Sequence, residues 1–240
     1  MTDLYQQIYL RKSCRKYQPN PLSAAQLSDI EEFINSMRPL LPKLEVGHRF
    51  AGAASVKGLL APKAPHYLII SGRPSPNRDL NVGFLFQQLD LYLSAQGLGA
   101  CWLGGANGKK SQFTKDDILA ICFGETVGPN TRTTAEFKRK TLAEIAGGED
   151  PRLEAVRLAP SGINSQPWYF MAADGAIHVY KTVYGKIRTA FYPHVEVDIG
   201  IALCHLFLAS EALGKPFEFK TAAPNVPPPP KGFAYVGTVC

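Results

Sequence analysis

Two long apolar stretches constrain the fold of this 240-residue chain more than any other feature. Residues 80–96 and 195–213 each predict a helix with apolar residues on most sides. A helix without a polar face belongs in the interior of a protein. The apolar run 199–209 is shorter than the roughly 18 residues of a membrane span, so it predicts a buried core helix. We expect the two helices to pack against each other at the centre of the molecule.

The two apolar stretches also resemble each other. Residues 82–99 and 198–214 each combine an early glycine, a long apolar helix and a terminal glycine. Such a weak internal repeat predicts two related halves, although two buried helices can share these features by coincidence.

Shorter signals predict the remaining elements. Ser23 and Gln26 have the spacing of a capping box at the start of a helix over residues 23–37. Asp174-Gly175 between two apolar runs predicts a tight hairpin. Further helices are expected at residues 2–10, 114–123 and 152–159, and strands at residues 66–70, 168–172, 177–180, 217–220 and 233–239.

The order of these elements predicts the fold class. Strands are separated by long helices, and one hairpin is present, which favours an α+β fold over a doubly wound parallel sheet. We expect two pseudo-symmetric halves, each with a mixed, largely antiparallel sheet flanked by helices.

Composition and charge narrow the class of ligand. Hydrophobic residues make up 45% of the chain and charged residues 19%, which is typical of a globular protein. The net charge of +6 could indicate nucleic-acid binding, but the basic residues are scattered apart from residues 11–16 and 138–140. Both clusters are too short to follow a duplex, so a small anionic ligand fits better and no nucleic-acid partner is expected.

The five cysteines indicate a reducing compartment. They are odd in number, lie far apart and form no C-x-x-C pair, which argues against a disulfide framework or a zinc site. The first residues lack the apolar core of a signal peptide. A cytoplasmic protein without membrane contact is therefore expected.

A basic cluster follows the first predicted helix. Arg11, Lys12 and Arg15, with the hydroxyl group of Ser13, form a dense set of donors suited to a phosphate monoester. The same cluster could also be an ordinary solvated helix end, and the cluster alone does not decide between the two.

The stretch 159–168 carries the second concentration of polar chemistry. Pro160 ends an apolar run, because a proline disfavours the α region in the residue before it. Ser161, Asn164 and Gln166 then offer donors and acceptors, and Gly162 allows a close approach to a flat ligand. An ordinary polar turn between helix and strand is the alternative.

Four stretches of the chain resemble the FMN-dependent nitroreductase family. Residues 159–168 match its A-P-S-x-x-N-S-Q-P-W motif, and residues 10–17 match its opening R-R-S-x-R-x-[FY] pattern. Residues 97–104 resemble its G-L-G-x-x-W-L-G turn, and residues 137–142 resemble its late basic motif. Together the four matches span most of the chain.

The order of the motifs differs from that of ordinary members of the family, in which the N-S-Q-P-W segment lies near the opening arginines. Here it comes last. Ordinary members are homodimers in which two subunits complete each flavin site. The resemblance therefore implies the fused, tandem branch of the TM nitroreductases, a monomer acting as an internal pseudo-dimer. Its halves would be residues 1–148, on the phosphate and N5 side, and residues 149–240, which carry the loop over the flavin.

The resemblance also implies roles for individual residues. The phosphate site would use the opening cluster together with Lys138 and Lys140, with Arg139 turned away between them. Lys57 or Lys63 could also reach the cofactor. The cofactor-binding set implied by the family is Arg11, Lys12, Ser13, Arg15, Trp102, Leu103, Gly104, Gly105, Lys138, Lys140, Pro160, Ser161, Gly162, Asn164 and Gln166.

The implied activity is a two-step hydride transfer. NADH or NADPH would reduce flavin N5, and the flavin would then reduce a small electron-poor acceptor such as a nitroaromatic or a quinone. No separate catalytic side chain and no metal ligand set is expected, because the cofactor carries this chemistry. A non-catalytic flavin-binding protein, serving as a sensor or a cofactor store, is the alternative.

Overall fold

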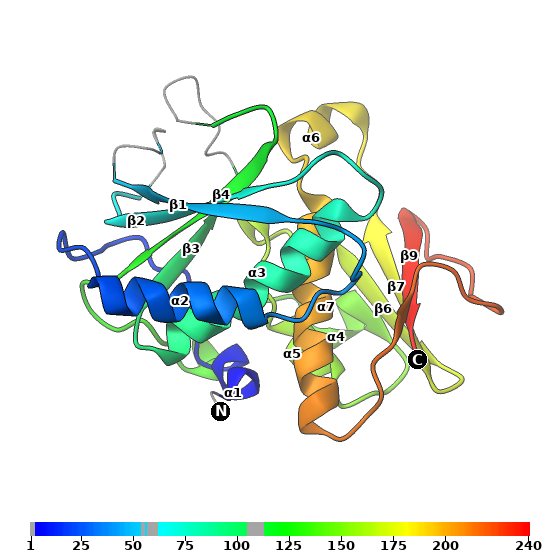
Figure 1. Cartoon of the computed structure of the whole chain (residues 1–240). Helices are drawn as coiled ribbons and strands as arrows, with labels where there is room; N and C mark the ends of the chain where they lie inside the picture. The colour runs from blue at the N-terminus through cyan, green and yellow to red at the C-terminus, as the bar shows by residue number, and fades with distance from the viewer. Residues whose placement is uncertain (1–2, 54–55, 57–61, 105–112) are drawn as a thin grey trace.

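A pair of crossing helices forms the centre of the fold, with one β-sheet on each side (Figure 1). The computed structural model describes residues 3–53, 56, 62–104 and 113–240. The two central helices are α3 (Arg78–Ala95) and α7 (Val195–Ala212). Most of their side chains are buried, as the apolar sequence predicts, and the α+β fold class is confirmed.

Two glycines set the distance between the central helices. A Cβ atom on Gly83 of α3 would lie 1.9 Å from the carbonyl oxygen of Val197, and one on Gly200 of α7 would lie 2.1 Å from that of Leu80. Each helix therefore contacts the backbone of the other through its own early glycine. The contact is reciprocal, which gives the repeat seen in the sequence a structural counterpart.

The first sheet contains four antiparallel strands in the order β1-β2-β4-β3. Their bounds are β1 (Gly47–Gly52), β2 (His66–Ser71), β3 (Gly99–Leu103) and β4 (Asp117–Gly124). The helix predicted at residues 114–123 is wrong, because this segment is the interior strand β4. An acidic start followed by apolar residues resembles a helix locally, but pairing with strands on both sides gives this buried run a complete set of backbone partners.

The second sheet contains five strands in the order β5-β6-β7-β9-β8. Their bounds are β5 (Ala146–Gly147), β6 (Trp168–Ala173), β7 (Ala176–Thr182), β8 (Phe219–Lys220) and β9 (Phe233–Val239). The predicted hairpin joins β6 to β7, and Asp174 and Gly175 both have positive φ angles, as a tight primed turn requires. Only the short β5–β6 pair is parallel among the described strands.

Shorter helices surround this framework. The capping box predicted at Ser23 is present at the start of α2. The helix α6, with no buried residue, was not predicted from the sequence. The bounds are α1 (Leu4–Ile8), α2 (Ala24–Ser36), α4 (Leu142–Ile145), α5 (Leu153–Arg157) and α6 (Lys186–Phe191), with short 3-10 turns at Thr134–Glu136 and Gly162–Asn164.

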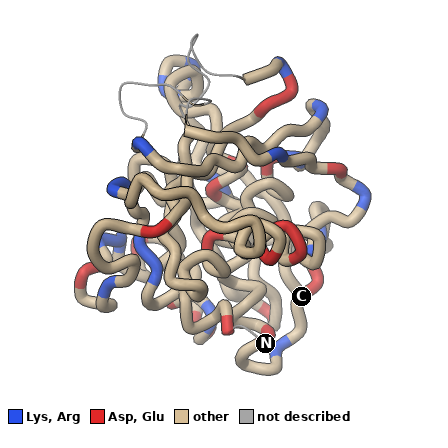
Figure 2. The backbone as a smooth tube through the Cα atoms, turned by 60° about the vertical axis from the view of Figure 1, so that its left-hand side comes forward, with Lys and Arg blue, Asp and Glu red and all other residues tan. Residues whose placement is uncertain are grey.

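Neither the charge distribution nor the length of the helices indicates binding to nucleic acid or to a membrane. Lys and Arg positions are spread over the molecule and alternate with Asp and Glu (Figure 2). Among the described residues, no helix combines the length and the apolar character needed to cross a membrane.

Candidate functional site

Two adjoining cavities lie where residues of the first sheet, the loop after α5 and the start of α7 meet. We call them the apolar cavity, of about 290 Å³, and the basic cavity, of about 510 Å³. They share the lining residues Ser13, Arg15, Pro160, Ser161 and Ile163. The opening cluster and the loop around residues 160–164 are therefore adjacent in the fold although they lie far apart in the sequence.

The basic cavity is rich in cations. Its lining includes Lys12, Arg15, Arg132, Lys138 and Arg139, with Glu136 the acidic residue among them. Burial and neighbouring guanidinium groups lower the pKa of Arg132 to about 10 and that of Arg139 to about 9. The cluster holds its positive charge at a free-energy cost, and a bound anion would reduce that cost.

Arg139 and Arg132 add to the set expected from the sequence. Arg139 does not turn away, because it lines the basic cavity and donates to Asn164 Oδ1 at 2.6 Å. Arg132 lies over the ring of Phe137, with its guanidinium carbon 3.6 Å from the ring centroid. No sequence motif identified Arg132. The fold brings it to the site, because the Arg11–Thr131 bridge lies beside it and its own N–H groups donate to the carbonyl oxygens of Leu10 and Arg11.

Arg11 lies away from both cavities. Its side chain is 1% exposed, and its Nε atom lies 2.9 Å from Asp90 Oδ2. It also donates to Ser13 Oγ at 3.2 Å. Arg11 therefore supports the cavity wall from behind, whereas Lys12, Ser13 and Arg15 line it.

The loop from Pro160 to Gln166 has an unusual backbone. Ile163, Asn164 and Gln166 have φ angles of 48°, 56° and 46°. This region is unfavourable for a β-branched residue, so surrounding contacts must hold the loop. Ser161 Oγ accepts from the backbone N–H of Gln166 at 2.9 Å, which closes the loop on itself.

The late basic stretch anchors the same loop. The Asn164 amide donates to the carbonyl oxygen of Lys138 at 2.8 Å, and Gln166 Oε1 accepts from the backbone N–H of Lys140 at 2.8 Å. Lys140 Nζ donates to the carbonyl oxygen of Gln166 at 3.1 Å. Gln166 and Lys140 therefore line neither cavity and hold the loop in place, whereas Asn164 and Lys138 also line the basic cavity.

Trp102 forms one wall of the apolar cavity and is held from behind by a buried polar chain. Its indole N–H donates to Gln87 Oε1 at 3.2 Å, and Gln87 Nε2 donates to Asp90 Oδ2 at 3.2 Å. Gln87 Nε2 also lies 3.2 Å from His205 Nε2 on α7. Because His205 Nδ1–H donates to the carbonyl oxygen of Ala155, its Nε2 is the acceptor, and burial lowers the pKa of this histidine to about 3. The orientation of Trp102 is thus fixed by groups from both central helices.

The other expected cofactor-binding residues at the end of the G-L-G-x-x-W-L-G turn, Leu103 to Gly105, differ in their positions. Gly104 lines the apolar cavity, and its carbonyl oxygen accepts from His194 Nε2 at 3.0 Å. Leu103 packs on the other face of the sheet and lines neither cavity. Gly105 and Lys57 lie outside the described residues, and Lys63 is exposed and lines neither cavity.

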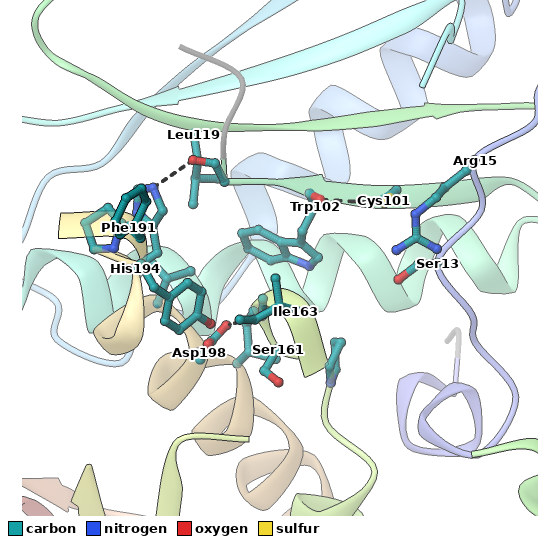
Figure 3. A pocket seen from close by; sticks show the side chains of 17 residues that line it. Ser13, Arg15, Cys101, Trp102, Leu119, Ser161, Ile163, Phe191, His194 and Asp198 are labelled. Carbon is teal, nitrogen blue, oxygen red and sulfur yellow. Dashed lines mark hydrogen bonds between the residues drawn. The ribbon is translucent and has the colours of Figure 1, made fainter. Parts of the chain in front are cut away.

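The segment 191–194 forms the opposite wall of the apolar cavity (Figure 3). A Cβ atom on Gly162 would lie 2.4 Å from the ring of Tyr192, so only glycine permits this contact. Phe191 and Ile163 are 86% and 82% exposed and line the same cavity. An apolar, partly aromatic enclosure with an apolar rim results, and it suits a flat ring system.

Asp198, near the start of α7, also lines the apolar cavity, and the motifs did not identify it. Its Oδ1 atom accepts from the backbone N–H of Gly162 at 3.0 Å, whereas its buried Oδ2 atom has no hydrogen-bond partner. Burial raises the pKa of this carboxyl group well above its usual range. An acidic residue inside an almost continuous apolar helix was the signal that could have found it.

Comparison with known proteins gives the family. Residues 3–210 match the model of the family described as "Putative TM nitroreductase". The chain belongs to this nitroreductase family, and its general class is that of an oxidoreductase.

A solved structure supports the fold, and another is similar to part of the chain. The crystal structure of a "putative nitroreductase" from Thermotoga maritima MSB8 is 20% identical, covers 99% of this chain and 93% of that chain, and has a TM-score of 0.70. A "Putative NADH dehydrogenase/NAD(P)H nitroreductase" from Bacteroides thetaiotaomicron VPI-5482 is 16% identical and covers 56% of this chain and 93% of that chain, with a TM-score of 0.46. A search of curated proteins finds no match.

Proposed function

We propose that the chain binds one FMN, with the phosphate group in the basic cavity and the ring in the apolar cavity. The observation that carries this proposal is the adjacency of the two cavities, which share five lining residues. FMN joins a phosphate to a flat tricyclic ring through a ribityl chain. A crowded cationic hollow beside an apolar aromatic one matches both ends of that molecule.

The residues present fit FMN in their donor chemistry. Lys12, Ser13, Arg15, Lys138 and Arg139 would hold the phosphate group, and the cost of crowding their charges supports an anion there. Trp102, Gly104, Pro160, Ser161 and Gly162 would enclose the ring. Arg11, Lys140 and Gln166 would act through the residues that they position.

The proposed activity is that of an NAD(P)H oxidoreductase. Bound FMN would supply hydride transfer from NADH or NADPH to a small electron-poor acceptor such as a quinone or a nitroaromatic. The apolar wall of Trp102 and Tyr192 and the rim of Phe191 and Ile163 support a flat, weakly polar acceptor. In the cell we place this activity in the cytoplasm.

We further propose that the site is complete within one chain, acting as a monomeric pseudo-dimer with halves 1–148 and 149–240. Both cavities are lined by residues from both proposed halves, for example Arg15 and Ser161. The short strand β5 pairs with the second sheet although it precedes the proposed boundary. The reciprocal glycine contact of α3 and α7 supports two related units packed against each other.

Titration of apoprotein with FMN, followed by anaerobic addition of NADH or NADPH, tests the proposal. We expect one FMN per chain and bleaching of the bound flavin by one of the two donors. Yellow protein that neither donor bleaches would support a flavin sensor or store and contradict the enzyme. Protein that does not bind FMN would overturn the whole proposal.

A further inference from the structure

Asp198 lines the apolar cavity, and one of its carboxyl oxygens has no hydrogen-bond partner among the described residues. The residue is 4% exposed, and its Oδ1 atom is held by the N–H of Gly162. Its Oδ2 atom is buried without a partner among the described residues, and the residue lines the cavity (Figure 3). A buried polar atom without a partner is costly, so such an atom in a cavity indicates a ligand group that it meets.

Among the described residues, no cation pairs with this carboxyl group. Burial is the main cause that raises its pKa, and the Gly162 N–H is the interaction that opposes it. The titratable groups that line the cavity with it are Arg15, Cys101, Tyr192 and His194. The described residues give Asp198 no ion pair with any of them, so the uncharged acid is the form that burial favours.

In the uncharged form, the proton belongs on Oδ2. Oδ1 already accepts a hydrogen bond from the backbone N–H of Gly162. A proton on Oδ1 in that direction would collide with the hydrogen of the donor, so Oδ2 carries it. Oδ2–H is then a hydrogen-bond donor beside the cavity, without an acceptor among the described residues. It would meet an oxygen atom of a bound acceptor, such as a quinone carbonyl.

We propose that Asp198 is the proton donor of the cavity, giving the proton of Oδ2 to a carbonyl oxygen of a quinone bound there. The inference rests on the proposed function, which supplies the hydride. A quinone takes up a hydride and a proton to form a hydroquinone. The Oδ2–H bond of Asp198 breaks, an O–H bond forms on the acceptor, and the carboxylate left behind regains a proton from water.

Asp198→Asn is the variant that tests this inference. The amide oxygen of asparagine can still accept from Gly162, so the loop keeps its contact, but the acidic proton is lost. Glu196→Gln, on the same helix, is the matched control, because Glu196 pairs with Lys181 and lies outside both cavities.

The rate of reoxidation of the reduced, FMN-loaded protein should distinguish proton donation by Asp198 from a general effect on electron transfer. With benzoquinone, we expect Asp198→Asn to be slower by about 10²- to 10⁴-fold, the range for general acid catalysis. Ferricyanide takes electrons without a proton, so its reaction should change less than about threefold relative to wild type. The Glu196→Gln control should react with both acceptors as the wild type does.

The experiment distinguishes a failure of the proposed function from a failure of the inference on Asp198. If neither NADH nor NADPH bleaches the wild type, the proposed function fails. If the wild type is bleached but Asp198→Asn reacts with benzoquinone as fast as wild type, only the inference on Asp198 fails. Equal slowing with benzoquinone and ferricyanide would show a general loss of electron transfer and would also overturn it.

A second measurement needs no cofactor. The infrared spectrum of wild-type apoprotein at neutral pH should contain the carbonyl band of an uncharged carboxyl group that is missing from Asp198→Asn and retained in Glu196→Gln. Identical spectra of all three proteins would show that Asp198 is ionised and has no proton to give.

Discussion

The two central helices are related by a reciprocal glycine contact, yet their buried acids have opposite surroundings. On α3, Asp90 lies 2.9 Å from Arg11 Nε and accepts from Gln87. On α7, Asp198 has one backbone donor and a free oxygen atom. Burial raises the pKa of both carboxyl groups, but Arg11 acts against that rise at Asp90 alone. One acid stabilises a wall, and the other faces the cavity.

This difference explains how two similarly packed helices would form a ligand site at only one of their two buried acids. Both oxygens of Asp90 have partners, because Arg11 donates to Oδ1 and Gln87 donates to Oδ2, and Gln87 also fixes Trp102 from behind. Asp198 lines the cavity, and its Oδ2 atom has no partner among the described residues. We therefore expect one ligand site per chain, and the following changes test how far the two helices differ.

The largest loss of stability is expected at the glycine contact between α3 and α7. Gly83→Ala would place a methyl group 1.9 Å from the Val197 carbonyl oxygen, and a backbone atom cannot move aside as a flexible side chain can. We expect destabilisation of about 5 kcal/mol or failure to fold, measured by urea unfolding. Gly52→Ala is the control, since a Cβ atom there meets nothing within 4 Å. Equal stability of the two variants would disprove the close helix contact.

The next largest loss of stability is expected at Asp90, which pairs with Arg11. Asp90→Asn leaves Arg11, which is 1% exposed, as a buried charge without its counter-ion. Removing one partner of a buried pair costs about 3 to 5 kcal/mol, so the midpoint of urea unfolding should fall markedly. Asp79→Asn, a partly exposed residue of the same helix paired with Arg78, should cost less than about 1 kcal/mol. Similar losses in both variants would contradict the assigned role of the Arg11–Asp90 pair.

The basic cavity gives a binding effect of intermediate size. Arg15→Ala should weaken FMN binding by about 1.5 to 3 kcal/mol, the range for a hydrogen bond to a charged group. The exposed Arg73 lies outside both cavities, so Arg73→Ala should bind FMN as the wild type does. Calorimetric titration of the apoproteins measures both. An unchanged dissociation constant for Arg15→Ala would argue against the phosphate site.

The raised pKa of Asp198 should make the free energy of unfolding depend on pH. The folded-state pKa of Asp198 lies above its unfolded value of about 3.9, so the folded protein holds the proton more tightly. Its contribution is fully present below the unfolded pKa and is lost as pH rises toward the folded pKa. The stability of Asp198→Asn relative to wild type should therefore increase from about pH 4 upward. A difference that stays constant with pH would show that the pKa of Asp198 is not raised.

The smallest expected effect is an absence of change on dilution. If α3 and α7 already bury each other within one chain, FMN should remain bound while the protein sediments as a monomer over a hundredfold dilution. Flavin lost together with dissociation of a dimer would mean that the site forms between chains. The comparison of α3 with α7 would then have to be made between subunits.

The sequence by itself determined the elements whose signals are local. The capping box at Ser23, the Asp174-Gly175 turn and the apolar helices α3 and α7 all follow from spacing that a short window contains. Motif resemblance likewise gave the family and the four stretches that meet at the cavities. These features depend on neighbouring residues, so no knowledge of distant partners was needed.

Only the tertiary structure decided what depends on distant partners. Residues 117–124 have the start of a helix in their sequence, but strands on both sides make them a strand. Arg11 and Arg15 belong to one motif, yet Asp90, 79 residues away, takes Arg11 into the core and leaves Arg15 in the cavities. Asp198 lines the cavity because the start of α7 contacts the loop at Gly162. Burial and charge pairing across the fold set the chemistry of these groups, and neither is encoded in a local pattern.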